Sequence, residues 1–557
     1  MISKKIVVQL ITSFCAKNGL SSWVLSPGSR NAPFTLTVAN DSRFENVSII
    51  DERSAAFIAL GKSLMTNRAT VLSCTSGTAS LNYSSAIAEA YYQKVPLLVI
   101  TSDRPQHWVG HGEGQSIKQI GVYDNFVKSS YHLNDDDSEE HIIKVLNNIE
   151  YDLSSGIPGP IHLNVSFEEP LYDTTDQSLI EWKSSTEEST IPNADFTTET
   201  FQWSSFKRIM IICGQRSVDP ALQNQLDLLN VDSRVVIVTE SLSNVSNFQF
   251  VNCIDRTLAL IDFGDKEMQP DLVITVGEAI ISKKIKSYLR KIEKLTHWNI
   301  HQNATFIDTF KCLKSVINYD ASQFLRSINT NYEPSTESDF SNKWLSASLL
   351  AFDEHTKFTR EVRWSDLKVF TILQDTFPEN INLHLGNSSV VRYNQLFNPI
   401  KSIRVYGNRG VSGIDGSTST AIGIASECKE KLNVLVSGDL SFIYDNNAFW
   451  NNLVLENFKV IVINNNGGGI FRIIPGPEGT GVQESHFEVG NKSSIQKLCD
   501  AHNLKYLSAS NEAELEEELY AFYNVESCVP VVLEVITPSE VNADVLKAYF
   551  DKMSAIH

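Results

Sequence analysis

The sequence lacks the features that mark several protein classes. Its eight cysteines are scattered over 557 residues without a CxxC pair, so we expect neither a disulfide scaffold nor a zinc ribbon. There is no HExxH motif, and the twelve histidines show no metal-ligand spacing. No apolar run approaches the roughly eighteen residues that a membrane-spanning helix requires. Positive charge is scarce, and the net charge of −19 argues against nucleic-acid binding, because neutralising phosphates requires a basic surface.

The start of the chain favours a helix over a signal peptide. Lys4 and Lys5 precede an apolar stretch in which Ile6, Leu10 and Phe14 recur at helical spacing, and no small-residue cleavage site follows. We therefore expect an amphipathic first helix and a cytoplasmic protein.

The chain does contain a repeated alternation of apolar strands and helical stretches. Two polar segments, 173–202 and 329–342, have the composition of linkers, and they suggest domains at 1–175, 200–330 and 343–557. Strands that are apolar throughout are typical of parallel sheets covered on both faces. We predict an α/β fold of three doubly wound parallel-sheet domains. The predicted strands are 23–25, 47–50, 70–73, 97–100 and 161–165, then 208–212, 234–238 and 272–276, then 381–385, 434–436, 460–463 and 530–535.

The segment 434–471 carries the clearest chemical signal. One apolar run ends in Gly438 and Asp439, and the next ends in Asn464 and Asn465, followed by Gly467. This spacing predicts a βαβ unit with polar groups at the carboxyl ends of both strands, where open parallel sheets place their sites. The Asp439 carboxylate, the Asn465 amide oxygen and the Gly467 carbonyl are hard ligands that suit Mg²⁺ holding a diphosphate. The alternative is an ordinary Rossmann-like crossover with a polar turn.

Polar turns also follow predicted strands of the first block. The turns 26–30, 75–79 and 102–105 expose backbone N–H groups, and two of them carry the fork-shaped cations Arg30 and Arg104. Local cations in an acidic protein suggest a site for a small anion.

These stretches together resemble the thiamine-diphosphate (ThDP)-dependent decarboxylase superfamily and, within it, the family of 2-succinyl-5-enolpyruvyl-6-hydroxy-3-cyclohexene-1-carboxylate (SEPHCHC) synthases. Leu440 is unusual for the superfamily but normal for this family, and Gly114 stands where the family carries asparagine. The motifs that carry the resemblance are Ser-Pro-Gly-Ser-Arg (26–30), Asp-Glu-Arg (51–53), Thr-Ser-Gly-Thr-Ala (75–79), Asp-Arg-Pro (103–105), Asn-Arg-Gly-Val-Ser-Gly-Ile-Asp-Gly (408–416), Gly-Asp-Leu-Ser (438–441) and Asn-Asn-Asn-Gly-Gly-Gly-Ile-Phe (464–471).

The resemblance implies pyrimidine-binding, middle and diphosphate-binding domains, with ThDP and Mg²⁺ or Mn²⁺ as cofactors. It implies decarboxylation of 2-oxoglutarate and 1,4-addition of the resulting carbanion to isochorismate, giving SEPHCHC and CO₂ in menaquinone biosynthesis. It also implies a homodimer with shared active sites, alone or paired into a tetramer. Two alternatives are an acetohydroxyacid synthase or simple 2-oxoacid decarboxylase, which needs fewer arginines, and a non-catalytic ThDP- or nucleotide-binding protein.

The family motifs assign roles to individual residues of this chain. Glu52 would hydrogen-bond the aminopyrimidine ring and promote its imino tautomer, which requires a raised pKa; the alternative is a helix-start acid favoured by the helix dipole. The implied substrate-binding residues are Ser29, Arg30, Arg104, Gln115, Lys283, Lys284, Arg392, Arg409, Ile470 and Phe471. The implied cofactor-binding residues are Glu52, Ser388, Ile414, Gly438, Asp439, Leu440, Ser441 and Asn465, with Asp439, Asn465 and Gly467 on the metal. The lysines could instead form a solvated helix face, and Ile414, expected to prop ThDP in its bent form, could be core packing.

Overall fold

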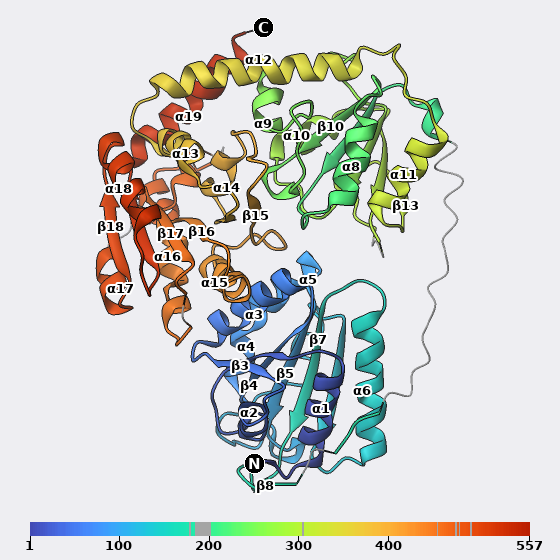
Figure 1. Cartoon of the computed structure of the whole chain (residues 1–557), viewed down its shortest axis with the longest axis vertical. Helices are drawn as coiled ribbons and strands as arrows, with labels where there is room; N and C mark the ends of the chain where they lie inside the picture. The colour runs from blue at the N-terminus through green and yellow to red at the C-terminus, as the bar shows by residue number, and fades with distance from the viewer. Residues whose placement is uncertain are drawn as a thin grey trace.

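Three parallel sheets, each flanked by helices, make up the protein (Figure 1). The computed structural model describes residues 1–177, 180–183, 202–302, 306–453, 455–473, 476–477, 480–490 and 493–556. The predicted α/β class with three parallel-sheet domains is confirmed. No helix in the described ranges is both long and apolar enough to cross a membrane.

The first sheet has six parallel strands in the order β3-β2-β4-β5-β7-β6. Its interior strands are buried along nearly their whole length, as expected for a sheet covered on both faces. The strands are β2 (Ser22–Leu25), β3 (Glu45–Ser48), β4 (Thr70–Cys74), β5 (Leu97–Asp103), β6 (Ser129–Asn134) and β7 (Pro160–Ser166). The helices are α1 (Ile6–Lys17), α2 (Ala32–Ala39), α3 (Glu52–Thr66), α4 (Thr78–Asn82), α5 (Ser84–Gln93), η1 (Gln106–Trp108) and α6 (Glu139–Ser154).

The middle sheet has five parallel strands in the order β10-β9-β11-β12-β13. The strands are β9 (Ile209–Cys213), β10 (Val235–Thr239), β11 (Leu272–Val276), β12 (Thr296–Ile300) and β13 (Leu313–Ile317). The helices are η2 (Trp203–Ser205), α8 (Pro220–Leu229), η3 (Ser241–Ser243), α9 (Ile254–Thr257), η4 (Leu258–Leu260), α10 (Lys283–Leu289) and α11 (Ala321–Asn331). The long helix α12 (Phe340–Glu361) then runs from the middle domain across to the last domain (Figure 1).

The last sheet has six parallel strands in the order β15-β14-β16-β17-β19-β18. The strands are β14 (Asn382–Leu385), β15 (Arg404–Tyr406), β16 (Asn433–Gly438), β17 (Phe458–Asn464), β18 (Lys505–Ala509) and β19 (Val531–Ile536). The helices are α13 (Asp366–Thr376), α14 (Ser389–Asn394), α15 (Ser417–Glu427), α16 (Asp439–Tyr444), η5 (Asn446–Phe449), η6 (Gly469–Arg472), the π-helix η7 (Gln483–Glu488), α17 (Ile495–Ala501), α18 (Glu512–Asn524) and α19 (Ser539–Ser554).

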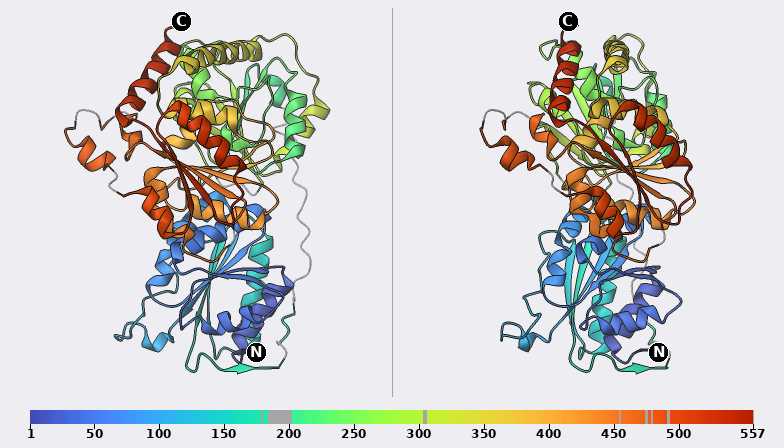
Figure 2. Two further views of the ribbon diagram at one scale, coloured as in Figure 1. Left: turned by 60° about the vertical axis from the view of Figure 1, so that its left-hand side comes forward. Right: turned by 90° about the vertical axis from the view of Figure 1, so that its left-hand side faces the viewer.

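The first and last domains share one continuous apolar core through α3 and α15. Buried residues of α3, including Phe57 and Ile58, pack with Ala421 and Ile422 of α15 in a single cluster. Figure 2 shows these helices at the junction of the two domains. The backbones approach so closely that a Cβ on Gly423 would lie 2.2 Å from the Ile58 carbonyl oxygen. Glycine is therefore required at position 423, where the two helices cross.

Several expectations about local structure need correction. The first helix exists, but Ile6 is 40% exposed and the buried residues are not confined to one stripe, so it is not simply amphipathic. In the three main sheets, strands β6, β12, β13, β15 and β18 were not predicted. The predicted strand 47–50 lies at 45–48 instead.

The two expected linkers are partly folded. In the first, β8 (Thr174–Thr175) pairs with β1 (Ile2–Ser3), and Trp182 is buried against Phe14 with ring centroids 5.1 Å apart. Residues 178–179 and 184–201 of that segment lie outside the described residues. The second segment overlaps the end of α11 and the start of α12.

Candidate active site

The expected metal ligands lie at the carboxyl ends of two neighbouring strands. β16 ends at Gly438 and β17 at Asn464, and the strands pair in parallel with Gly438 opposite Ile463. Asp439 begins α16 and is 2% exposed, and Asn465 is 5% exposed. Gly467, at φ +131°, makes the turn after β17, where a side chain would meet the Glu488 carbonyl oxygen at 2.5 Å. The strand pairing thus places these residues along one edge of the sheet.

Asp439 has an oxygen that fits a metal ligand. Within the described chain, its Oδ2 is buried and has no hydrogen-bond partner. Burial raises the pKa of Asp439 to about 7, against backbone hydrogen bonds from Leu440 and Gly467 that lower it. A cation at Oδ2 would favour the charged carboxylate and satisfy this oxygen. No group of three or more His, Cys, Asp or Glu side chains that could hold a metal occurs in the described ranges, but the expected set needs only one carboxylate.

Asp366, which the sequence did not flag, orients the second expected ligand. Its buried carboxylate accepts hydrogen bonds from Asn465 Nδ2 at 3.0 Å, Thr537 Oγ1 at 2.6 Å and Asn542 Nδ2 at 2.9 Å. Because the Asn465 amide nitrogen is held by Asp366, its amide oxygen points away from that carboxylate and is available to a cation. Such outer hydrogen bonds fix the orientation of metal ligands.

The expected diphosphate and ring-supporting residues come from two further loops. Ser388 adopts φ +72° at the start of α14, an uncommon conformation for a residue with a side chain and one that clusters at ligand sites. Ser441 Oγ donates to the Ile414 carbonyl at 2.6 Å, which joins the Gly-Asp turn to the loop 407–416. The Ile414 side chain is 41% exposed, so the core-packing interpretation does not describe it.

Arg392 and Arg409 form a cationic cluster between the last and middle domains. Arg409 Nη1 donates to Asn387 Oδ1 at 2.7 Å. The Nε groups of both arginines are buried, and neither has a hydrogen-bond partner in the part of the chain that is described. Burial lowers the pKa of Arg409, and the neighbouring Arg392 lowers it further. Two forked cations with unsatisfied donors favour an anionic ligand such as a carboxylate.

The lysines of α10 differ from expectation. Lys283 is exposed, and no interaction recorded in the described structure links it to the arginines. Lys284 Nζ lies 3.2 Å from the Phe550 ring centroid, and burial lowers its pKa to about 8. Lys286, not predicted, interacts electrostatically with Arg409, Arg392 and the buried Glu240, and burial lowers its pKa. Lys286 lies three residues beyond Lys283 on the same helix. A motif match alone could not tell which of these lysines lies near the arginines.

The first domain gathers a second set of expected residues at the carboxyl edge of its sheet. Arg30 is 5% exposed; its Nη1 donates to the Phe167 carbonyl at 3.0 Å, and its Nη2 lies 3.2 Å from Glu169 Oε1. Burial lowers the pKa of Arg30, and the nearby Arg104 lowers it further. Arg104 Nε donates to the carbonyl of Gly114, the position that departs from the family, at 3.1 Å.

Ser29 and Gln115 complete this set. Ser29 is exposed in the turn before α2. Gln115 adopts φ +53° and lies against the turn at Gly77, where a Cβ would be 3.2 Å from the Gln115 Cα. The three polar turns of the first block lie together, because the Arg30 N–H donates to Thr75 Oγ1 at 3.1 Å and Arg104 interacts electrostatically with Arg30.

Glu52 is the first residue of α3 and lies four residues beyond Ser48, the last residue of β3. Burial raises its pKa, as the expected role requires, and Asn82 Nδ2 lies 3.4 Å from its Oε2. Asp51 caps the helix by accepting from the Ser54 N–H, so Glu52 is not needed as the cap. Beyond the metal turn, Ile470 and Phe471 are partly buried in η6, and Phe471 lies 5.6 Å from the Phe487 ring.

Comparison with known proteins identifies the family. Family models match three successive segments: "Thiamine pyrophosphate enzyme, N-terminal TPP binding domain" at 6–122, "Middle domain of thiamine pyrophosphate" at 173–385, and "Thiamine pyrophosphate enzyme, C-terminal TPP binding domain" at 385–535. Proteins named SEPHCHC synthase are similar over their full length. Those of Flavobacterium johnsoniae and Flavobacterium psychrophilum are 38% and 39% identical, with 100% of both chains covered. That of Porphyromonas gingivalis is 35% identical, covering 99% of this chain and 98% of the relative.

The chain belongs to the SEPHCHC synthase family. This confirms the resemblance drawn from the motifs, and the matched domains support ThDP as the cofactor. Membership in the SEPHCHC synthase family also separates the chain from the acetohydroxyacid synthase alternative. The structure adds Asp366, Lys286 and Glu240 to the residues surrounding the site. Each lies outside the quoted motifs, so only the fold could reveal it.

Proposed function

We propose that this protein catalyses the ThDP- and Mg²⁺-dependent decarboxylation of 2-oxoglutarate and joins the remaining unit to isochorismate by 1,4-addition, releasing CO₂ and SEPHCHC in menaquinone biosynthesis. The observation that carries the substrate assignment is the pair Arg392 and Arg409, whose buried Nε groups lack partners in the described structure. Both substrates are dicarboxylates, and arginine binds carboxylates through two parallel hydrogen bonds.

The last domain would hold the cofactor. Asp439, Asn465 and the Gly467 carbonyl would bind Mg²⁺, with Mn²⁺ as the other candidate ion, and Ser388, Gly438, Leu440 and Ser441 would hold the diphosphate. Ile414 would support the bent cofactor. When bound, ThDP supplies the electron sink for loss of CO₂.

Glu52 would keep a proton near the cofactor ring. Burial raises the pKa of this carboxyl, so it can hold a proton near neutral pH and share it with a ring nitrogen. The preceding residue, Asp51, already caps the helix, so the cap does not depend on Glu52.

The two sets of cations would divide the substrate carboxylates. Arg30 and Arg104, with Ser29 and Gln115, would bind isochorismate. Arg392 and Arg409 would bind 2-oxoglutarate, with Lys283 or Lys284 nearby and Lys286 better placed than either. Ile470 and Phe471 would line the pocket and exclude water from the reacting atoms.

We further propose a cytoplasmic homodimer with shared active sites, in which the expected domains 1–175, 200–330 and 343–557 act as units. Exposed apolar side chains support a covering subunit. Ile50, two residues before Glu52, is 50% exposed, and Leu81, next to the Glu52 partner Asn82, is 46% exposed. Val411 in the Arg409 loop is 54% exposed. Eight free cysteines, six of them buried between Cys15 and Cys499, are compatible with a reducing compartment. Sedimentation would distinguish this dimer from a tetramer of paired dimers.

An assay with all four components tests the proposal. ThDP, Mg²⁺, 2-oxoglutarate and isochorismate are mixed with the protein, and loss of isochorismate absorbance is followed. Loss that requires every component supports the function. Decarboxylation without consumption of isochorismate would mean a different acceptor, and CO₂ release from pyruvate alone would favour a simple 2-oxoacid decarboxylase. Arg392→Ala should raise KM for 2-oxoglutarate while ThDP binding is retained; unchanged kinetics would remove its role.

A further inference from the structure

A buried carboxylate of the first domain holds the loop of the last domain that carries Arg409. Glu89 lies on α5 and is 2% exposed. Its Oε1 accepts the Gly410 N–H at 2.6 Å, and its Oε2 accepts the Val411 N–H at 2.7 Å, with the Ser412 N–H at 3.4 Å. One side chain therefore satisfies successive backbone donors of a loop more than three hundred residues away in sequence.

The loop also approaches α5 through its backbone. A Cβ on Gly410 would lie 2.5 Å from the Glu89 carbonyl oxygen and 3.0 Å from the Gln93 nitrogen. A residue with a side chain would push the loop off the helix, so the glycine permits the short hydrogen bonds to Glu89.

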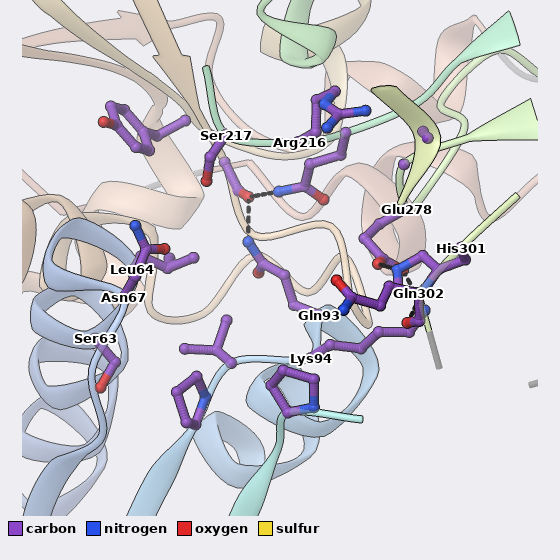
Figure 3. Close-up of a pocket in the computed structure, with 18 of the residues that line it drawn as sticks. Ser63, Leu64, Asn67, Gln93, Lys94, Arg216, Ser217, Glu278, His301 and Gln302 are labelled. Atoms are coloured by element: carbon purple, nitrogen blue, oxygen red, sulfur yellow. Dashed lines mark hydrogen bonds and ion pairs between the residues drawn. The ribbon is translucent and has the colours of Figure 1, made fainter. Parts of the chain in front are cut away.

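A second pair of contacts holds the beginning of the loop. Gln215 Nε2 of the middle domain donates to the Gly407 carbonyl at 2.8 Å, and Gln93 Nε2 lies 3.5 Å from the same oxygen. Figure 3 shows Gln93 directed at this point, above Lys94, on the wall of a cavity of about 330 Å³ lined by all three domains. The start of the loop is thus tied to both other domains.

Asn387, which belongs to the same domain as the loop, also forms hydrogen bonds with it. Asn387 Nδ2 donates to the carbonyls of Asn408 and Gly413 at 2.7 and 2.6 Å, and Asn387 Oδ1 accepts from Arg409 Nη1. Glu89 therefore accepts from backbone N–H groups, and Asn387 donates to backbone carbonyls, of the turn in which Arg409 lies. The charge of Glu89 also interacts favourably with Arg409.

We propose that Glu89 is a positioning residue, which sets the backbone of the loop 407–416 so that the Arg409 guanidinium faces the substrate carboxylate. This inference rests on the proposed function of Arg409. Burying a carboxylate is costly unless it is hydrogen-bonded, and here its partners are loop N–H groups that a neutral side chain of the same size could satisfy only in part. The first domain thereby controls a substrate contact of the last domain within one chain.

Glu89→Gln tests the proposal in the ThDP- and Mg²⁺-loaded enzyme. Glutamine keeps the size but turns one acceptor into a donor that faces a loop N–H. We expect KM for 2-oxoglutarate to rise about tenfold, the loss of one hydrogen bond to a charged group, with kcat changed far less. In the Arg409→Ala background the same substitution should change KM by less than about twofold, because residues acting through one contact are not additive.

Hydrogen exchange provides a readout that does not depend on Arg409. Peptides covering 408–416 should exchange faster in Glu89→Gln than in the unsubstituted protein. The matched control is Glu278→Gln, which removes the carboxylate that pairs with Lys94 at 2.9 Å and also joins the first and middle domains, but makes no recorded contact with 408–416 in the described structure. It should leave both KM and exchange of this peptide unchanged. If Glu89→Gln does not fold, Glu89→Asp, which sets the carboxylate back by one methylene, is measured in the same way.

The outcomes separate the two proposals. If Arg409→Ala leaves KM unchanged, the assignment of Arg409 fails, and the positioning role of Glu89 toward substrate fails with it. If Arg409→Ala raises KM but Glu89→Gln does not, or does so equally in both backgrounds, the inference about Glu89 is overturned while the proposed function stands. A rise in KM and faster loop exchange in Glu89→Gln alone, absent from Glu278→Gln, supports it.

Discussion

The first and last sheets have the same topology but carry different chemistry. Their strand orders, β3-β2-β4-β5-β7-β6 and β15-β14-β16-β17-β19-β18, are the same when the strands of each are counted along the chain. The helices that follow the second strand of each, α3 and α15, pack against each other. Yet the first sheet presents an acid and two arginines at its carboxyl edge, whereas the last presents the Gly-Asp and Asn-Asn turns. The fold fixes where functional groups can lie, and the side chains at the strand ends decide what they do.

The largest effect should come from a substitution of Glu52, at the carboxyl edge of the first sheet. Glu52→Gln keeps the shape of the side chain but cannot exchange a proton with the cofactor ring, so we expect kcat to fall by roughly a thousandfold, while Mg²⁺-dependent ThDP binding is retained. The matched control is Glu139→Gln, which changes an exposed acid at the first position of α6 and should leave turnover unchanged. Full activity of Glu52→Gln would return Glu52 to the role of a helix-start acid.

The junction between the two sheets should be the next most sensitive. Gly423→Ala would place a methyl group 2.2 Å from the Ile58 carbonyl oxygen and 2.9 Å from the Gly61 Cα. Since both are backbone atoms, the helices must separate, and we expect a loss of about 3 kcal/mol in unfolding free energy, measured by thermal unfolding. Gly159→Ala, whose nearest neighbour would lie at 4.0 Å, is the control. Equal midpoints for both variants would contradict the close crossing of α3 and α15.

At the carboxyl edge of the last sheet, a substitution can disrupt the hydrogen bond between Asp366 and the expected metal ligand Asn465. Asp366→Asn presents an amide where Asn465, Thr537 and Asn542 now donate to a carboxylate, so the Asn465 amide should lose its fixed orientation. We expect Mg²⁺ affinity, measured by ThDP binding at varied Mg²⁺, to weaken by about 10- to 100-fold. Asp375→Asn, exposed at the other end of α13, should have no effect. Unaltered Mg²⁺ dependence in Asp366→Asn would separate Asp366 from the metal site.

The sequence predicted the strands that are continuous apolar runs and missed those that contain polar or exposed residues. Interior strands such as β4, β9, β11 and β17 are largely apolar runs, and the predicted bounds lie within two residues of the observed ones. The missed strands β6, β13, β15 and β18 lie at or beside sheet edges and are partly exposed, so they lack such runs. β12 is buried but carries His297 and Asn299, whose hydrogen bonds with Thr275 of β11 only the folded sheet provides.

Among the candidate site residues, too, those in a local sequence motif were predicted and those outside one were missed. Asp439, Asn465 and Glu52 lie within three residues of the ends of apolar runs, so a motif in the sequence marks their positions. Asp366, Glu89 and Lys286 lie on other elements and contact Asn465, the loop 407–416 and Arg409 respectively, and no local sequence pattern marks them. The family motif points to Lys283 and Lys284 of α10, but the electrostatic interaction of Lys286 with Arg392 and Arg409 depends on how α10 packs, which the sequence does not show.

We expect the smallest effect from the loss of stability at low pH that is caused by one buried histidine in the first sheet and one in the last. His162 of β7 bonds with Thr101 Oγ1 at 2.8 Å, and His384 of β14 with Asn433 Oδ1 at 3.0 Å. Burial lowers the pKa of His162 to about 3 and that of His384 to about 4. The unfolded chain, with a histidine pKa near 6.5, therefore binds the extra proton first, so the stabilisation is complete above about pH 6.5 and is lost as pH falls toward the folded values.

Each of these histidines should contribute a loss of about 1.4 kcal/mol per pH unit below 6.5. We expect the unfolding midpoint to fall between pH 7 and pH 5 and to fall less steeply in His162→Gln or His384→Gln, with His141→Gln on the exposed face of α6 as the control. Because the two folded pKa values differ only near pH 3 to 4, the two variants should be indistinguishable down to pH 5. A clear difference between them in that range would show that the two sheets, alike in topology, do not bury their histidines alike.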